Sequence, residues 1–343
     1  MSTSEKSLNI MINRGAHSDA GAERLKQVLD DLARTGPNRA GLSNALRSLP
    51  DEPRFTKIGE MRIKFQFSDG SLSKYHIHPQ GMARDHRTGE FYVSAEEIIM
   101  KKGPETKGNA YLFRFSPQWK PIQAIALKAV GDEIHPGGID IHENTLYVPV
   151  SPHRRRSSAT IFEMPLDTRI PAPLFPVTDY HIGFVALNPS SGEFHMMSWD
   201  AAMWFRFSRD GQRLEARKNP TFDKFSYQDA QVLTDSSFLL TGVASICGPQ
   251  CGPDFGLDLI NGKTGNVEKS IRWAAPPHRN AQGWVPLQNP TYIWLDHRGR
   301  ILVLGAPNSQ VGEHGDRVYG PKDAGTEPWQ SSLLLYEISR KQK

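Results

Sequence analysis

The sequence predicts an all-β protein that folds as a single β-propeller, closed by an N-terminal strand and preceded by a short helical extension. The first supporting observation is a module in which a histidine and a glycine-containing bend precede an apolar strand, a polar turn and a second strand. It is clearest in His-Pro-Gly-Gly-Ile-Asp at 135–140 and the apolar segment at 145–152. The second is that this module recurs every roughly 45 to 60 residues, as propeller blades do. The third is a further strand of alternating polar and apolar residues after each copy.

The module occurs in five copies, which predicts five blades. Six blades are the alternative, if the strand before the first copy belongs to a fuller unit. The first two strands of the copies fall within 78–94, 135–152, 181–199, 227–242 and 289–305, and the third strands lie at 111–115, 159–163, 203–207, 255–259 and 333–337.

The residues before the first copy have a different pattern. Residues 22–32 place four apolar side chains at helical spacing, which predicts an amphipathic helix, and 42–49 can form a second short helix. The strand at 62–67 precedes the first copy, and we expect it to form the outer strand of the last blade. Pairing the two chain ends in this way closes the ring and removes exposed sheet edges. The chain therefore divides into a helical or partly disordered extension at 1–55 and a propeller at 56–343.

Composition excludes several classes of partner. The formal charge of +4 comes from 41 basic and 37 acidic residues without an extended basic patch, so nucleic-acid binding is not expected. The sequence contains no run of about 18 apolar residues, so it predicts no membrane span. The start lacks the apolar core of a secretory signal, which makes a cytoplasmic location the default expectation. Cys247 and Cys251 can form a local disulfide or remain two free thiols.

Polar side chains precede the first strand of each copy, and these positions converge on the central channel of a propeller. Glycines at Gly81, Gly137 and Gly138 are expected to allow close approach of the backbones there. Histidines at strand starts can instead be structural, each tying one blade to the next through a backbone carbonyl. The converging side chains, together with one aromatic residue at a second-strand end, are His78, Gln80, His135, His181, Tyr227, Gln228, Asp229, Asn289 and Trp199.

We expect no metal and no cofactor at this site. The three histidines come from separate blades, and first-strand positions are expected to hold their imidazoles too far apart for shared ligation. No carboxylate ring follows the repeat, as a calcium-dependent lactonase would need. No Gly-Xaa-Ser-Xaa-Gly segment indicates a nucleophilic serine.

Five short motifs carry a resemblance to a known family. They are His-Pro-Gln-Gly-Met at 78–82, His-Pro-Gly-Gly-Ile-Asp at 135–140, Tyr-Val-Pro-Val at 147–150, His-Ile-Gly at 181–183 and Tyr-Gln-Asp at 227–229. Over about 60–338 the chain resembles a largely uncharacterised propeller family of bacteria and fungi. It is similar to the fungal hetero-Diels-Alderases of tropolone-sesquiterpene biosynthesis, in which an o-quinone methide tropolone adds across an alkene of a humulene-type terpene.

The resemblance implies an enzyme of secondary metabolism that binds small, hydrophobic, oxygenated substrates. Such a reaction needs two partners held in register, with polar donors at the oxygen of the heterodiene. Two alternatives stay open, namely a metal-dependent lactonase or hydrolase and a non-catalytic propeller that binds small molecules or proteins. In the implied site, His78, His135 and His181 are donors and acids, and the substrate-binding residues are Gln80, Trp199, Tyr227, Gln228, Asp229 and Asn289.

Overall fold

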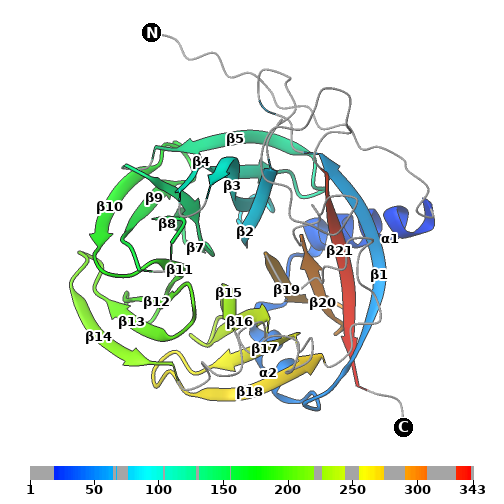
Figure 1. The fold of residues 1–343 in the computed structure, drawn as a ribbon. Coiled ribbons are helices and arrows are strands. Elements are labelled where there is room, and N and C mark those ends of the chain that lie inside the picture. Colours follow the sequence, from blue (N-terminus) through cyan, green and yellow to red (C-terminus); the bar gives the residue numbers. More distant parts are fainter. Residues whose placement is uncertain are drawn as a thin grey trace.

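Five antiparallel sheets are arranged in a ring in the computed structural model of the protein, which is the architecture of a five-bladed β-propeller (Figure 1). In each sheet the strands follow one another outward from the axis, so the first strand of each module is innermost. The fold class and the number of blades predicted from the sequence are thus confirmed. The structure describes residues 19–64, 67, 76–102, 105–128, 131–154, 156–219, 226–243, 255–273, 290–306 and 330–340.

The first two blades contain the most regular copies of the module. Blade one has four strands, and blade two has five because its inner segment is split in two by the Gly137-Gly138 bend. The strands are β2 (His76–Arg84), β3 (Phe91–Lys102), β4 (Glu105–Phe115) and β5 (Pro121–Leu127) in blade one, and β6 (Glu133–Pro136), β7 (Asp140–His142), β8 (Thr145–Pro152), β9 (Ala159–Pro165) and β10 (Ala172–Val177) in blade two.

The next three blades repeat the four-stranded arrangement. All five predicted third strands are present, because alternating polar and apolar residues suit a strand packed between neighbouring blades. The strands are β11 (Ile182–Leu187), β12 (Phe194–Ser198), β13 (Met203–Phe207) and β14 (Arg213–Lys218) in blade three, β15 (Ser226–Val232), β16 (Phe238–Val243), β17 (Phe255–Ile260) and β18 (Val267–Trp273) in blade four, and β19 (Thr291–Leu295), β20 (Ile301–Gly305), β21 (Gln330–Ser339) and β1 (Arg54–Lys64) in blade five.

The ring is closed by pairing of segments from opposite ends of the chain. Strand β1 pairs antiparallel with β21, from Arg54 opposite Ser339 to Lys64 opposite Gln330, and forms the outer edge of blade five (Figure 1). The predicted closure is therefore confirmed, although the strand begins eight residues before the alternating segment at 62–67. Because β1 precedes blade one in the chain, its hydrogen bonds to β21 attach the N-terminal segment to the last blade, where β1 covers the edge of β21.

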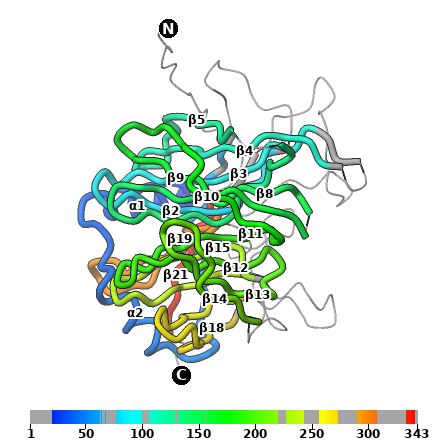
Figure 2. Tube along the Cα trace, turned by 90° about the vertical axis from the view of Figure 1, so that its left-hand side faces the viewer, coloured from blue at the N-terminus to red at the C-terminus, as the bar shows by residue number. Residues whose placement is uncertain are grey.

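Two helices precede the ring, and both lie on one side of it in the side view (Figure 2). Helix α1 (Asp19–Thr35) buries Leu25 and Leu29 in a cluster formed with blades one and five. Helix α2 (Arg39–Arg47) buries Leu42 against blades four and five. Both predicted helices are thus present, packed against the propeller. None of the helices in the described part of the chain combines the length and the apolar character needed to cross a membrane.

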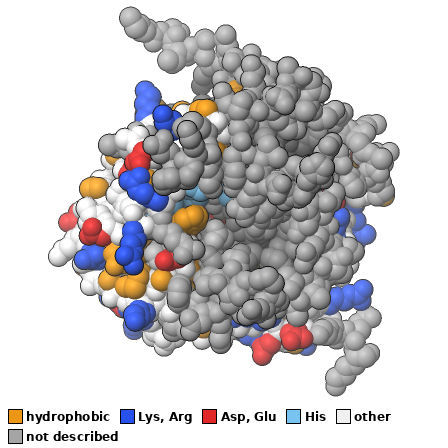
Figure 3. All heavy atoms as spheres, in the orientation of Figure 1, with side chains coloured by type: hydrophobic (Ala, Val, Ile, Leu, Met, Phe, Trp, Pro, Cys, Tyr) orange, Lys and Arg blue, Asp and Glu red, His pale blue; other side chains and the backbone are white. Residues whose placement is uncertain are grey.

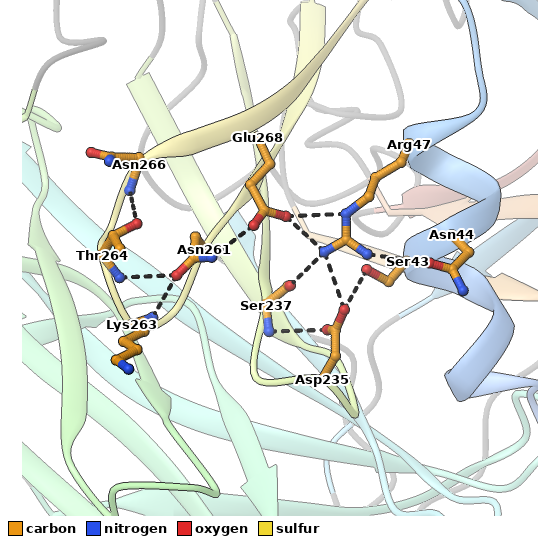
Figure 4. A network of polar contacts seen from close by, with 10 residues as sticks. All are labelled: Ser43, Asn44, Arg47, Asp235, Ser237, Asn261, Lys263, Thr264, Asn266 and Glu268. Atoms are coloured by element: carbon orange, nitrogen blue, oxygen red, sulfur yellow. Dashed lines mark hydrogen bonds and ion pairs between the residues drawn. The ribbon is translucent and has the colours of Figure 1, made fainter.

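A polar network holds the end of α2 against blade four (Figure 4). Arg47 donates to Glu268 at 2.7 Å and to Asp235 at 3.2 Å, and Ser43 donates to the same Asp235 carboxylate at 2.7 Å. These contacts join segments about two hundred positions apart in the sequence. The helical extension is therefore attached to the ring by both apolar and charged contacts.

The inner strands meet backbone to backbone near the axis. A methyl group on Gly81 would lie 2.6 Å from the Gly138 Cα, and one on Gly137 would lie 2.3 Å from the Gly183 carbonyl oxygen. Real side chains do not approach this closely, so the predicted need for glycine at Gly81, Gly137 and Gly138 is confirmed. Asp229 completes the contact, since its carboxylate accepts hydrogen bonds from backbone amides of β2 and β19. We call this region, formed by the three glycines and Asp229, the waist of the propeller.

Candidate functional site

The predicted histidines gather at one end of the axis. His78 and Gln80 lie in β2, His135 lies in β6, and His181 directly precedes β11. The Gln80 Nε2 atom lies 3.1 Å from His135 Nε2, and His135 Nδ1 lies 3.2 Å from His181 Nε2. Histidine side chains are visible near the middle of the corresponding face (Figure 3). Strand starts from three blades thus bring their polar side chains together.

The hydrogen bonds assign the tautomers of two imidazoles. His181 Nδ1 lies 2.9 Å from the Arg154 carbonyl oxygen, which can only accept, so Nδ1 carries the proton. His181 Nε2 must then accept, and His135 Nδ1 donates to it. The remaining nitrogen of His135, Nε2, keeps its lone pair and accepts from the amide of Gln80. His135 therefore directs its Nε2 lone pair toward Gln80, and the Gln80 amide must move aside before Nε2 can bind another group.

Burial keeps the two central imidazoles neutral at neutral pH. It lowers the pKa of His135 well below the usual 6.5, and the neighbouring His181, His153 and His78 lower it further. Burial also lowers the pKa of His181 to about 4, against an opposing hydrogen bond to the Arg154 carbonyl. Neutral imidazoles serve as metal ligands or proton acceptors. The geometry therefore favours an acceptor role for His135 Nε2 over the acid role that the resemblance implied, while both nitrogens of His181 are already engaged.

A buried carboxylate lies among the histidines. The side chain of Glu96, in β3, is fully buried, and its Oε1 atom lies 2.9 Å from His78 Nδ1. The same oxygen lies 3.6 Å from His153 Nε2 and 3.9 Å from His135 Nε2. One donor atom from each of Glu96, His135 and His153 lies within 4.8 Å of the other two. We call these three residues the Glu96 triad.

The spacing of the triad is close to that of ligands around a metal ion. Ligand atoms about 2.0–2.2 Å from a tetrahedral ion lie roughly 3.3–3.5 Å from one another. The Glu96 oxygen lies 3.6 and 3.9 Å from the two imidazole nitrogens, and all three donor atoms lie within 4.8 Å of one another, so ligation needs these atoms to move inward. The expectation of imidazoles too far apart for ligation concerned His78, His135 and His181, of which only His135 belongs to the triad, so it stays a prediction for those three together.

The sequence-based reasoning missed His153. It sought polar residues before first strands, whereas His153 follows the second strand of its blade. A signal for it was present in the repeat. Serine recurs near the end of the second strand in three blades, as Ser94, Ser151 and Ser198, and each pairs with the first strand of its blade. The residues two positions later are Glu96, His153 and Asp200. The reasoning took Trp199 from a second-strand end, and examining the same position in every blade would have found the second imidazole of the triad.

Trp199 lies beside the histidines, as expected for an aromatic wall. Its ring stacks on His181 with a centroid separation of 4.7 Å and an interplanar angle of 15°. It also lies 5.4 Å from the ring of His135 and 5.5 Å from that of His153. The side chain is only partly buried, so a flat apolar surface borders the imidazoles.

Other predicted substrate-binding residues lie elsewhere or serve the fold. The hydroxyl group of Tyr227 donates to Asp258, and its ring is buried among apolar residues of blades three and four. Asp229 accepts from backbone amides at the waist, which is a structural role. Gln228 is half-buried, and its carbonyl oxygen lies against Gly138. Asn289 lies outside the described residues, as do Cys247 and Cys251.

Comparison with known families identifies the chain. Residues 54–235, a little over half of the sequence, match the model of a family of unknown function, DUF6454. The chain belongs to the DUF6454 family. The matched range includes the Glu96 triad together with His78, Gln80, His181 and Trp199. No curated protein matches the chain.

Solved structures resemble this DUF6454 member at low identity. A protein of unknown function from Bacteroides caccae is 11% identical, with a TM-score of 0.42, over 84% of this chain and 97% of that one. The calcium-binding protein regucalcin from Agrobacterium tumefaciens is 10% identical, with a TM-score of 0.45, over 86% and 98%. A protein of unknown function from Dyadobacter fermentans is 14% identical, with a TM-score of 0.46, over 76% of each chain.

Proposed function

We propose that this DUF6454 protein is a metal-dependent enzyme that acts on small oxygenated molecules, and that the Glu96 triad holds the metal. The observation that carries the proposal is the convergence of one carboxylate and two imidazoles within 4.8 Å of one another. Three such ligands are typical of catalytic zinc sites, where a fourth position stays open for water or substrate. Hydrolysis of an ester or lactone is the reaction class that best fits such a centre, since a bound metal polarises a carbonyl group and activates water.

The surrounding side chains suit this role. His181 fixes the tautomer of His135 so that Nε2 carries the lone pair, which the Gln80 amide must release before Nε2 can bind a metal. His78 donates to the Glu96 carboxylate at 2.9 Å and orients it. Contacts of this kind position metal ligands and raise their affinity. The partly exposed Trp199 ring gives an apolar part of a substrate a surface on which to pack.

The test is metal binding measured before and after substitution of the triad. We expect one zinc ion per chain by elemental analysis of protein prepared with zinc, and hydrolysis of simple esters or lactones that chelation abolishes and zinc restores. Glu96→Gln and His153→Ala should each weaken zinc binding by more than about a hundredfold, because even substitutions beyond the ligands cost about 10–100-fold. His195→Ala is the matched control, since His195 is another buried histidine that packs against Trp204 and Phe238. A protein that binds no metal, or activity that survives chelation, would refute the proposal.

Hetero-Diels-Alder cycloaddition is the second candidate. Its support is the motif resemblance together with the partly exposed Trp199 ring, a flat surface against which two apolar partners can be held in register. Such catalysis needs no metal, so chelation distinguishes the candidates. Metal-free protein should accelerate addition of an o-quinone methide to a humulene-type alkene, and Trp199→Ala should lower the rate and selectivity. An unchanged product ratio with and without protein would contradict this candidate.

A further inference from the structure

A second polar cavity lies beyond the waist, where the inner strands end. It is lined by Arg84 of β2, Asp140 of β7, Tyr292 of β19 and His86 after β2. Arg39, the first residue of α2, also lines it, which places the cavity on the side of the ring that carries the helices (Figure 2). The cavity is small, of the size that holds a water molecule or a monatomic ion.

Several buried donors in this cavity have no hydrogen-bond partner among the described residues. They are Nε of Arg39, Nε and Nη1 of Arg84 and Nδ1 of His86. The hydroxyl group of Tyr292 accepts from Arg84 and can still donate its own proton. Arg84 is only 3% exposed and Tyr292 only 2%. Arginine nitrogens donate and never accept, and the imidazole and phenol can also donate. A group that satisfies all of them must therefore be an acceptor.

The charges around the cavity favour a negative acceptor. Arg39 and Arg84 are permanently cationic. Burial, with the two nearby guanidinium groups, lowers the pKa of His86 to about 3, so this imidazole is neutral at neutral pH. Asp140 is the one carboxylate that lines the cavity; its Oδ2 atom accepts from the Leu187 amide at 2.9 Å, and burial raises its pKa. Even with Asp140 ionised, the two guanidinium groups leave the cavity with an excess positive charge, which is costly without a counterion.

We propose that this cavity is a binding site for a small monovalent anion of the size of chloride. The guanidinium groups of Arg39 and Arg84 supply charge-assisted hydrogen bonds, and His86 and Tyr292 complete the donor set. Because Arg39 belongs to α2 while Arg84 and Tyr292 belong to blades one and five, the bound anion links the helical extension to two blades. Its occupancy therefore stabilises the docked extension.

Bromide binding tests the site directly, since anomalous diffraction locates this ion. Crystals of the unsubstituted protein soaked in sodium bromide should show one bromide among the four donors, and formate or sulfate should not replace it. In solution, chloride and bromide should raise the unfolding temperature more than sulfate does at equal ionic strength. A water molecule at the centre of the cavity in bromide-soaked crystals, or equal stabilisation by all three anions, would overturn the proposal.

Two arginines on the protein make a matched pair for substitution. Arg84→Met should weaken the apparent halide affinity by about tenfold or more, because hydrogen bonds to a charged ligand are lost. Arg206→Met removes an arginine that pairs with Glu215 in blade three, and should leave the halide affinity unchanged. Equal loss in both variants would assign the effect to general electrostatics and contradict a specific site. If Arg84→Met does not fold, the bromide map of the unsubstituted protein still decides the question.

Discussion

Replacement of Asp229 by alanine should destabilise the propeller strongly, because this carboxylate joins three inner strands. Its Oδ2 atom accepts from the Met82 amide of β2 at 2.9 Å and from the Thr291 amide of β19 at 3.3 Å. Its Oδ1 atom accepts from the Ala230 amide of β15 at 3.0 Å. The side chain is 2% exposed, so water cannot simply replace it. A buried amide left without an acceptor costs about 1–3 kcal/mol, which gives an expected loss of about 3–9 kcal/mol for the three together.

Urea denaturation followed by tryptophan fluorescence and circular dichroism measures this loss. Asp229→Asn should be less damaging than the alanine variant, because one side-chain oxygen remains to accept a hydrogen bond. The control is Asp210→Ala, which removes an exposed carboxylate in a turn of blade three and should have a much smaller effect. Equal unfolding midpoints for Asp229→Ala and Asp210→Ala would refute the assignment of Asp229 to the waist.

Three further outcomes follow from other contacts. Gly138→Ala should destabilise the fold by about 2–3 kcal/mol in the same assay, since the added methyl would lie 2.7 Å from a phenylalanine side chain. Arg47→Met should cost about 0.5–1 kcal/mol near neutral pH. Arg47 lowers the pKa of Glu268 below its usual 4.5, so that contribution is present above this pH and is lost as the pH falls below it. In urea titrations, the free energies of unfolding of the unsubstituted protein and of Arg47→Met should therefore become equal in acid. His181→Phe should weaken zinc binding about 10–100-fold, because His135 would lose the hydrogen bond that orients it as a ligand. His195→Phe should leave zinc binding unchanged, and a chelator competition assay measures both.

The sequence predicted the architecture because its signals are local and repeated. Each module combines alternating strands with a polar turn, and five copies specify five sheets without any knowledge of long-range contacts. The closure by β1 was also predictable, since a strand without a blade of its own can pair only at the open edge of the ring. The start of β1 at Arg54 was not, because residues 54–61 lack the strict alternation that marked 62–67.

The sequence predicted the candidate site as far as the position of each residue within its repeat. Position within the repeat placed His78, His135 and His181 at one end of the axis. It could not distinguish a polar group that faces the site from one that accepts hydrogen bonds from backbone amides. Asp229 occupies the expected phase, yet its carboxylate turns toward the amides of neighbouring strands. That orientation depends on the close approach of glycine backbones from other blades, which no local pattern records.

The two proposed sites share strand β2 but should act independently. His78 lies at one end of this strand and Arg84 at the other, and six steps of about 3.3 Å separate them by roughly 20 Å. This distance exceeds the screening length of about 8 Å at physiological ionic strength, so direct charge coupling between the ends is weak. The close backbone contact of Gly81 with Gly138 lies between them. Arg84→Met should therefore abolish the response to halide while zinc binding at the Glu96 triad is retained. Loss of both together would indicate that the substitution distorts β2, and would remove the evidence for a local anion site from that variant.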